Sequence, residues 1–148
     1  MYKDVICERV ALCENNEFPL LIHEFKNSFF VIGDHQYYKG YSLLYLKKHV
    51  RELHHMPKEE YLELSDELYR ASLALEKTLD PLKLNVMCIG NQTPHIHWHL
   101  MPRYQSDPNH KELPLFEATR GEVDLANYKT DPLQVEPLIQ AIKENITV

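Results

Sequence analysis

The chain has 148 residues, of which 44% are apolar, a size typical of one domain with one hydrophobic core. Its 16 Lys and Arg residues against 22 Asp and Glu residues give a net charge of -6, which argues against a polymeric nucleic acid partner. No apolar run approaches the ~20 residues that span a bilayer, and the N-terminus lacks the pattern of a secretory signal. We therefore expect a cytoplasmic protein of one domain, residues 1–148, without membrane contact.

The predicted elements begin with a β-hairpin. Two short β-prone runs between Leu20 and Ile32 flank Lys26-Asn27-Ser28, which is typical of a hairpin turn. The segment 41–46 is apolar and aromatic and has the length of a strand. Its richness in apolar and aromatic residues places it near the centre of a sheet.

A long helix is predicted after Pro57. Proline suits the first turn, and the acidic residues behind it complement the positive end of the helix dipole. Two further strands are predicted over 84–89 and 95–101, and a second amphipathic helix over 132–146 follows an irregular stretch. This order predicts an α+β fold, with an antiparallel sheet of about five strands, a main helix and a C-terminal helix.

Three of the nine histidines, His95, His97 and His99, alternate with large apolar residues. Side chains of a strand alternate between its faces, so the imidazoles share one face and the apolar residues between them face a core. A central imidazole whose second nitrogen is held by an acceptor can act as a nucleophile, and its neighbours can support it or donate to anionic oxygens. The pattern favours phosphorus chemistry, with Arg103 as a nearby cation.

Zinc binding is the alternative interpretation of the three histidines. The outer two lie four residues apart, about 13 Å at ~3.4 Å per residue, so a straight strand does not bring all three to one ion. Further ligands would have to come from His54-His55 or His110. We therefore predict no metal and no cofactor, and a zinc-dependent hydrolase stays an alternative.

The run from His95 to Met101, followed by Pro102-Arg103, resembles the signature of the histidine triad (HIT) family of nucleotide hydrolases and transferases. The resemblance covers residues 18–104. It implies a homodimeric enzyme that cleaves phosphoric anhydride or phosphoramidate bonds at the α-phosphorus of a purine nucleotide, through a covalent nucleotidyl intermediate on His97. Diadenosine tetraphosphate and nucleoside phosphoramidates are substrates of this kind. The alternative from another class is a nucleotide-binding regulatory module with vestigial catalysis.

The resemblance also implies roles for individual residues. His99 would contact the phosphate or the leaving group, and His95 would orient the His97 ring through its backbone carbonyl. The remaining nucleotide contacts implied are Asp34 for the ribose, Leu21 and Ile22 for the base, and Asn91, Gln92 and Thr93 for the phosphate, with Asn85 as a rival to Asn91.

Two features depart from the family pattern. The polar turn before His95 is one residue short, and Tyr41 stands where the family commonly has a histidine after glycine. We expect Tyr41 to face the site as a neutral support for His95 or for a phosphate oxygen, since a phenol with a pKa of about 10 stays protonated near pH 7. The competing expectation is that strand alternation points Tyr41 into the core.

Overall fold

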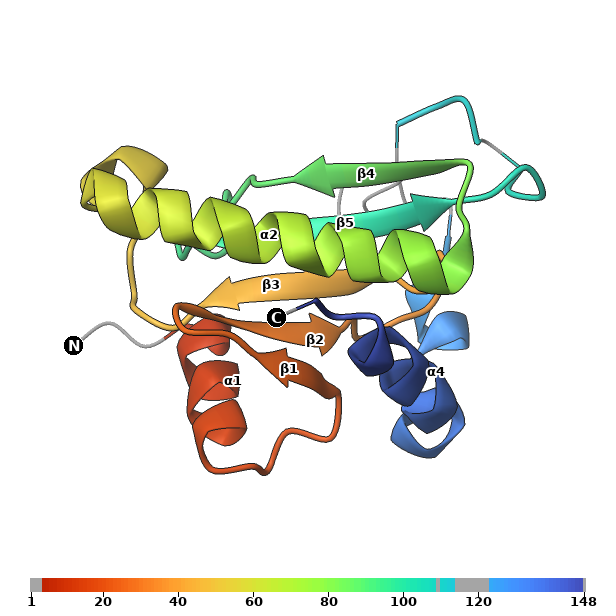
Figure 1. The fold of residues 1–148 in the computed structure, drawn as a ribbon. Helices are drawn as coiled ribbons and strands as arrows, with labels where there is room; N and C mark the ends of the chain where they lie inside the picture. The colour runs from red at the N-terminus through yellow and green to blue at the C-terminus, as the bar shows by residue number, and fades with distance from the viewer. Residues whose placement is uncertain (1–3, 109, 114–122, 148) are drawn as a thin grey trace.

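The computed structural model describes residues 4–108, 110–113 and 123–147. Figure 1 shows the arrangement of its helices around one sheet. The α-helices are α1 (Val5–Glu14), α2 (Lys58–Leu79) and α4 (Pro132–Glu144), the 3-10 helices are η1 (Leu53–His55) and η2 (Leu125–Tyr128), and the strands are β1 (Leu21–Glu24), β2 (Ser28–Ile32), β3 (Ser42–Leu46), β4 (Lys83–Met87) and β5 (His97–Arg103).

The five strands form one antiparallel sheet in the order β1-β2-β3-β5-β4. The α+β prediction is therefore confirmed, as is the central place of β3. Several predicted boundaries differ by one or two residues. The difference that affects the histidines is that β5 begins at His97 and leaves His95 just before the strand. The Ile96 amide donates to the Val50 carbonyl at 2.8 Å, and this contact anchors the approach to β5.

One face of the sheet packs against α2 and α4, and α2 crosses in front of the strands in Figure 1. Ile96, Trp98 and Leu100 are buried on this face, as the alternation predicted. Helix α2 begins directly after Pro57 and ends at Leu79, and the φ of 44° at its C-cap residue Asp80 lies in the left-handed region. The helix and the triad strand thus share one core.

Helix α1 covers the opposite face and was not predicted from the sequence. Asp4 caps it, since its side chain accepts a hydrogen bond from the Cys7 amide at 2.8 Å. Ile6, Val10 and Cys13 are buried at helical spacing against the aromatic and apolar residues of β2 and β3. This packing places α1 beside the face of β5 that carries His97 and His99.

The segment that contains η2 returns to the loop after β2. The Thr130 amide donates to the Asp34 carbonyl at 2.8 Å, and the Thr130 hydroxyl donates to the Gly33 carbonyl at 2.5 Å. Residues close to the C-terminal helix therefore fix the loop that carries Asp34. None of the helices in the described ranges has the length and apolarity needed to cross a bilayer.

Candidate active site

A cavity of about 500 Å³ opens between α1, the β3–β5 face of the sheet and the turn that precedes His95. It is large enough for a nucleotide-sized ligand. Its polar side chains come from Arg9, Asp34, His35, Tyr41, Tyr45, Asn91, Gln92, Thr93, His97 and His99, and its apolar side chains from Val5, Ile6, Leu43, Ile89, Met101 and Leu125.

His97 is held in one orientation by its own chain. Its Nδ1 lies 2.6 Å from the His95 carbonyl oxygen, a distance that requires Nδ1–H to donate. Burial lowers the pKa of His97, so the ring is neutral near pH 7 and carries its lone pair on Nε2. His97 lines the cavity, and Nε2 is the ring nitrogen opposite the bound one. This geometry suits a nucleophile.

The side chain of His95 lies beneath α1, outside the cavity lining. Its Nε2 donates to the Leu46 carbonyl at 2.7 Å, and its Nδ1 lies 3.4 Å from Asp4 Oδ1 and 3.5 Å from Cys7 Sγ. Only its backbone carbonyl reaches His97. The prediction that all three imidazoles share one open face is therefore wrong for His95. His97 and His99 line the cavity, whereas α1 covers the side chain of His95.

Tyr41 lines the cavity, and its hydroxyl lies 2.8 Å from Nδ1 of His99. Burial lowers the pKa of His99 to about 4 and raises the pKa of Tyr41, so both groups are neutral near pH 7. Gly33 makes room for the phenol, since a Cβ on Gly33 would lie 2.5 Å from the Tyr41 ring. Tyr41 therefore faces the site, and its partner is His99 instead of His95.

Asp34 lies at the cavity, where it forms an ion pair with Arg9 of α1. The other end of the same guanidinium donates to the Tyr45 hydroxyl at 2.7 Å. Tyr45 is the cross-strand partner of His97 in the β3–β5 register. Arg9 therefore links the predicted ribose contact to the neighbour of the predicted nucleophile.

The remaining predicted residues divide into two groups. Asn91, Gln92 and Thr93 line the cavity, whereas their rival Asn85 accepts a hydrogen bond from Arg103. Arg103 is only 1% exposed and stacks over the Tyr38 ring, so it is a buried structural cation and not part of the cavity wall. Leu21 and Ile22 also lie outside the cavity lining, because β1 is separated from β5 by two strands.

Sequence reasoning missed Val5, Ile6 and Arg9, which reach the cavity from α1. A signal was present, since Asp4 is a favourable N-cap and the apolar positions behind it have helical spacing. Tyr45 was missed for another reason. It shares the face of Tyr41 by strand alternation, but only the β3–β5 register brings it beside His97.

A second cluster of chemical interest adjoins His95. Nitrogen, sulfur and oxygen atoms of Asp4, Cys7, His49 and His95 all lie within 4.8 Å of one another. Burial raises the pKa of Asp4, but the Cys7 amide and the two imidazoles outweigh this effect, and the net pKa is lowered. These donor types fit zinc, which binds thiolate, imidazole and carboxylate. His54, His55 and His110 are not members of the cluster.

Comparisons with known proteins identify a family and a fold. The family model of the HIT domain matches residues 18–106, and no curated protein matches the chain. Solved structures share the fold at low sequence identity. A histidine triad protein from Bradyrhizobium japonicum is 23% identical with a TM-score of 0.72, and the match covers 86% of this chain and 90% of that protein.

Two further solved structures share the fold. A zinc-bound histidine triad family protein from Mycobacterium smegmatis is 19% identical with a TM-score of 0.65, and the match covers 93% of each chain. The Plasmodium falciparum diadenosine triphosphate hydrolase, in complex with cyclomarin A, is 15% identical with a TM-score of 0.64. That match covers 86% of this chain and 76% of the hydrolase. At these identities the likeness is one of fold.

Proposed function

The chain belongs to the histidine triad (HIT) family, and from that premise we propose that it cleaves purine nucleotide conjugates at the α-phosphorus. The substrate is a dinucleoside polyphosphate or a nucleoside phosphoramidate, so the bond broken is a phosphoric anhydride or a phosphoramidate. The observation that carries this proposal is the 2.6 Å hydrogen bond from His97 Nδ1 to the His95 carbonyl, at the wall of a nucleotide-sized cavity.

In the first step, the Nε2 lone pair of His97 attacks the α-phosphorus. A phosphorus–nitrogen bond forms to the ring while the bond to the leaving group breaks. His99 donates a hydrogen bond to the leaving group, since a Tyr41 hydroxyl that donates to Nδ1 leaves the ring proton on Nε2. A phosphate leaves as the anion, whereas an amine takes its proton from solvent.

In the second step, water attacks the same phosphorus atom and the bond to His97 Nε2 breaks. The products are a nucleoside monophosphate, one proton and the neutral imidazole, which is ready for another cycle. A different acceptor in place of water makes the same chemistry a nucleotidyl transfer. Throughout, Asp34 accepts from the ribose hydroxyls, and the turn of Asn91, Gln92 and Thr93 donates to the phosphate.

The cluster of Asp4, Cys7, His49 and His95 would hold a zinc ion in this proposal. The ion would neutralise a carboxylate and a thiolate that are packed against two imidazoles. His95 keeps its Nε2–H bond to the Leu46 carbonyl while Nδ1 faces the other donors. The effect on chemistry is indirect, because the carbonyl of His95 orients His97.

A nucleotide-binding module with vestigial catalysis is the second candidate. The observation that favours it is Tyr41, a neutral phenol in the position where the family commonly has histidine. The two candidates differ in one measurement. A module binds AMP but does not turn over diadenosine tetraphosphate or adenosine phosphoramidate, whereas the enzyme cleaves at least one of them.

Replacement of the nucleophile tests the mechanism. His97→Asn should abolish turnover and leave AMP binding within about tenfold, because the loss falls on the transition state. His54→Asn is the matched control, since His54 is an exposed histidine on η1, away from the cavity. Mass spectrometry of the quenched wild-type enzyme should detect a nucleotidyl adduct on His97. Turnover by the His97→Asn variant would contradict the covalent mechanism.

A further inference from the structure

Helix α1 brings a charged residue into the cavity that the mechanism above does not use. Arg9 donates from Nη1 to the Tyr45 hydroxyl at 2.7 Å and forms an ion pair from Nη2 to Asp34 Oδ2. The side chains of Arg9 and Asp34 are 23% and 55% exposed, so the pair lies at the open part of the cavity. A partly exposed ion pair has a small net stabilising effect, and a ligand can replace it.

The charges around the cavity make Arg9 important for an anionic ligand. Among the described lining residues, Arg9 is the only Lys or Arg and Asp34 the only Asp or Glu. Arg103, the cation expected from sequence, is buried elsewhere. Among the lysine and arginine residues of the described wall, Arg9 alone can therefore meet a phosphate with its charge.

We propose that Arg9 is a specificity-determining residue that binds a phosphate of the substrate and so selects nucleotides over nucleosides. The proposal rests on the nucleotide site described above. Tyr45, which Arg9 contacts, is the cross-strand partner of His97, so the guanidinium lies on the side of the cavity where the reacting phosphorus must sit. A guanidinium binds phosphate oxygens through two parallel N–H donors.

The ion pair with Asp34 explains how this selection works. In the ligand-free protein, Arg9 and Asp34 satisfy each other. A nucleoside that donates its ribose hydroxyls to Asp34 weakens this pair and gives Arg9 nothing in return. A nucleotide places hydroxyls on Asp34 and phosphate oxygens on Arg9, so both charges keep a partner. Arg9 thus strengthens the binding of a ligand that carries a phosphate and weakens the binding of one that lacks it.

The test compares binding of AMP and adenosine, neither of which needs to be turned over. Calorimetry should show that Arg9→Ala weakens AMP binding about tenfold or more, while adenosine binding is unchanged or tighter. Arg9→Gln is the second variant, since its amide can still donate to the Tyr45 hydroxyl if packing requires that contact. Arg51→Ala, at an exposed arginine outside the cavity lining, should bind both ligands as the wild type does.

Two results would overturn the proposal. Equal losses for AMP and adenosine in both Arg9 variants would mean that Arg9 acts only by holding Asp34 and Tyr45 in place. Unchanged binding of both ligands would mean that no phosphate contact exists. These outcomes are separate from the His97→Asn experiment, because that variant reports turnover. Wild-type protein that binds neither ligand would contradict the nucleotide site and this proposal together.

Discussion

At the scale of single residues, two hydrogen bonds set the tautomers of His97 and His99. His97 donates Nδ1–H to a backbone carbonyl, and His99 faces the hydroxyl of Tyr41 through Nδ1. A backbone carbonyl only accepts, so the tautomer of His97 is fixed. A phenol both donates and accepts, and the neutral state of both Tyr41 and His99 is what allows the phenol to donate.

The first prediction concerns this phenol. Tyr41→Phe removes one hydroxyl and leaves the ring against Gly33 and His35. Loss of a hydrogen bond of about 1 kcal/mol to His99 should lower kcat/KM about fivefold. Tyr69→Phe is the control, because Tyr69 is 64% exposed on α2. Unchanged steady-state kinetics in the Tyr41 variant would mean that the phenol has no functional role and would favour the binding-module candidate.

At the scale of elements, α1 decides the character of the site. Its N-terminal turn supplies Asp4 and Cys7 to the cluster around His95, and its middle supplies Arg9 to the cavity. One helix therefore supplies residues both to the cluster and to the cavity. The described C-terminal segment has a similar role, because Thr130 holds the loop that carries Asp34.

The second prediction concerns the cluster under α1. The protein should bind about one equivalent of zinc, and Co²⁺ in its place should give a thiolate charge-transfer band. Cys7→Ala should abolish the band and lower the metal content, while Cys88→Ala, at an exposed cysteine outside the cluster, should change neither.

Metal removal separates a structural ion from a catalytic one. Chelator-treated protein should lose thermal stability but keep activity at temperatures where it is folded, because His97 and His99 are not members of the cluster. Activity that is lost on stripping from the folded protein and restored by zinc alone would favour the zinc-dependent hydrolase. Absence of zinc binding would contradict the assignment of the cluster.

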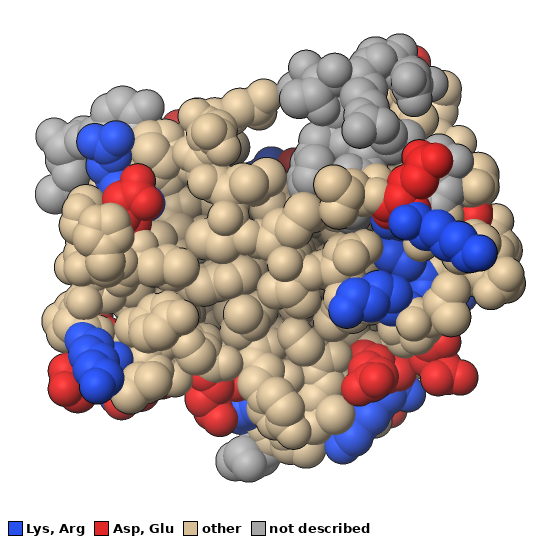
Figure 2. All heavy atoms as spheres, turned by 90° about the horizontal axis from the view of Figure 1, so that it is seen from above, with Lys and Arg blue, Asp and Glu red and all other residues tan. Residues whose placement is uncertain are grey.

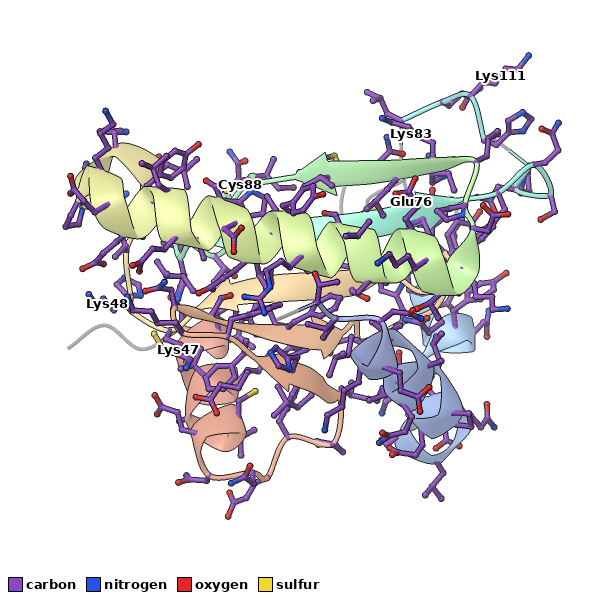
Figure 3. All side chains as sticks on the ribbon, in the orientation of Figure 1. Lys47, Lys48, Glu76, Lys83, Cys88 and Lys111 are labelled. Carbon is purple, nitrogen blue, oxygen red and sulfur yellow. The ribbon has the colours of Figure 1, made fainter. Side chains whose placement is uncertain are left out.

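At the scale of the whole molecule, β4 is an edge strand of the sheet. Figure 2 views this side from above, and charged side chains gather towards its margins. A second hollow of about 320 Å³ lies between the end of α2 and the start of β4. Figure 3 labels Glu76 and Lys83, which contribute to its wall from these two elements. Exposed large apolar side chains near this hollow include Tyr69 on α2, Leu82 just before β4, Val86 on β4 and Ile89 just beyond it.

The third prediction is that two copies associate, as the family resemblance implies, and that this surface forms the contact. An unpaired edge strand with exposed apolar side chains is suited to such an interface. Val86→Lys should weaken the dimer at least about tenfold, because it places a charge in a desolvated contact. Leu133→Lys, at an 86% exposed residue of α4, should leave association unchanged. Sedimentation equilibrium measures both, and a monomeric wild type would contradict the prediction.

The sequence by itself determined the features that depend on local periodicity. Alternation over His95 to Met101 fixed which residues face the core, and helical spacing after Pro57 fixed α2, because each pattern is a property of a few consecutive residues. The family also followed from the triad run, and the HIT domain match confirms it. That residues 1–148 form one domain stays a prediction.

Only the tertiary structure decided which charges and donors meet. Arg9 and Asp34 are 25 positions apart, and Cys7 and His95 are 88 positions apart. No local pattern relates such residues, since their contact depends on how α1 packs on the sheet. The same reason explains why Arg103 is not part of the cavity wall. Its charge was visible in the sequence, but its burial against the Tyr38 ring and the Glu112 carbonyl is set by packing.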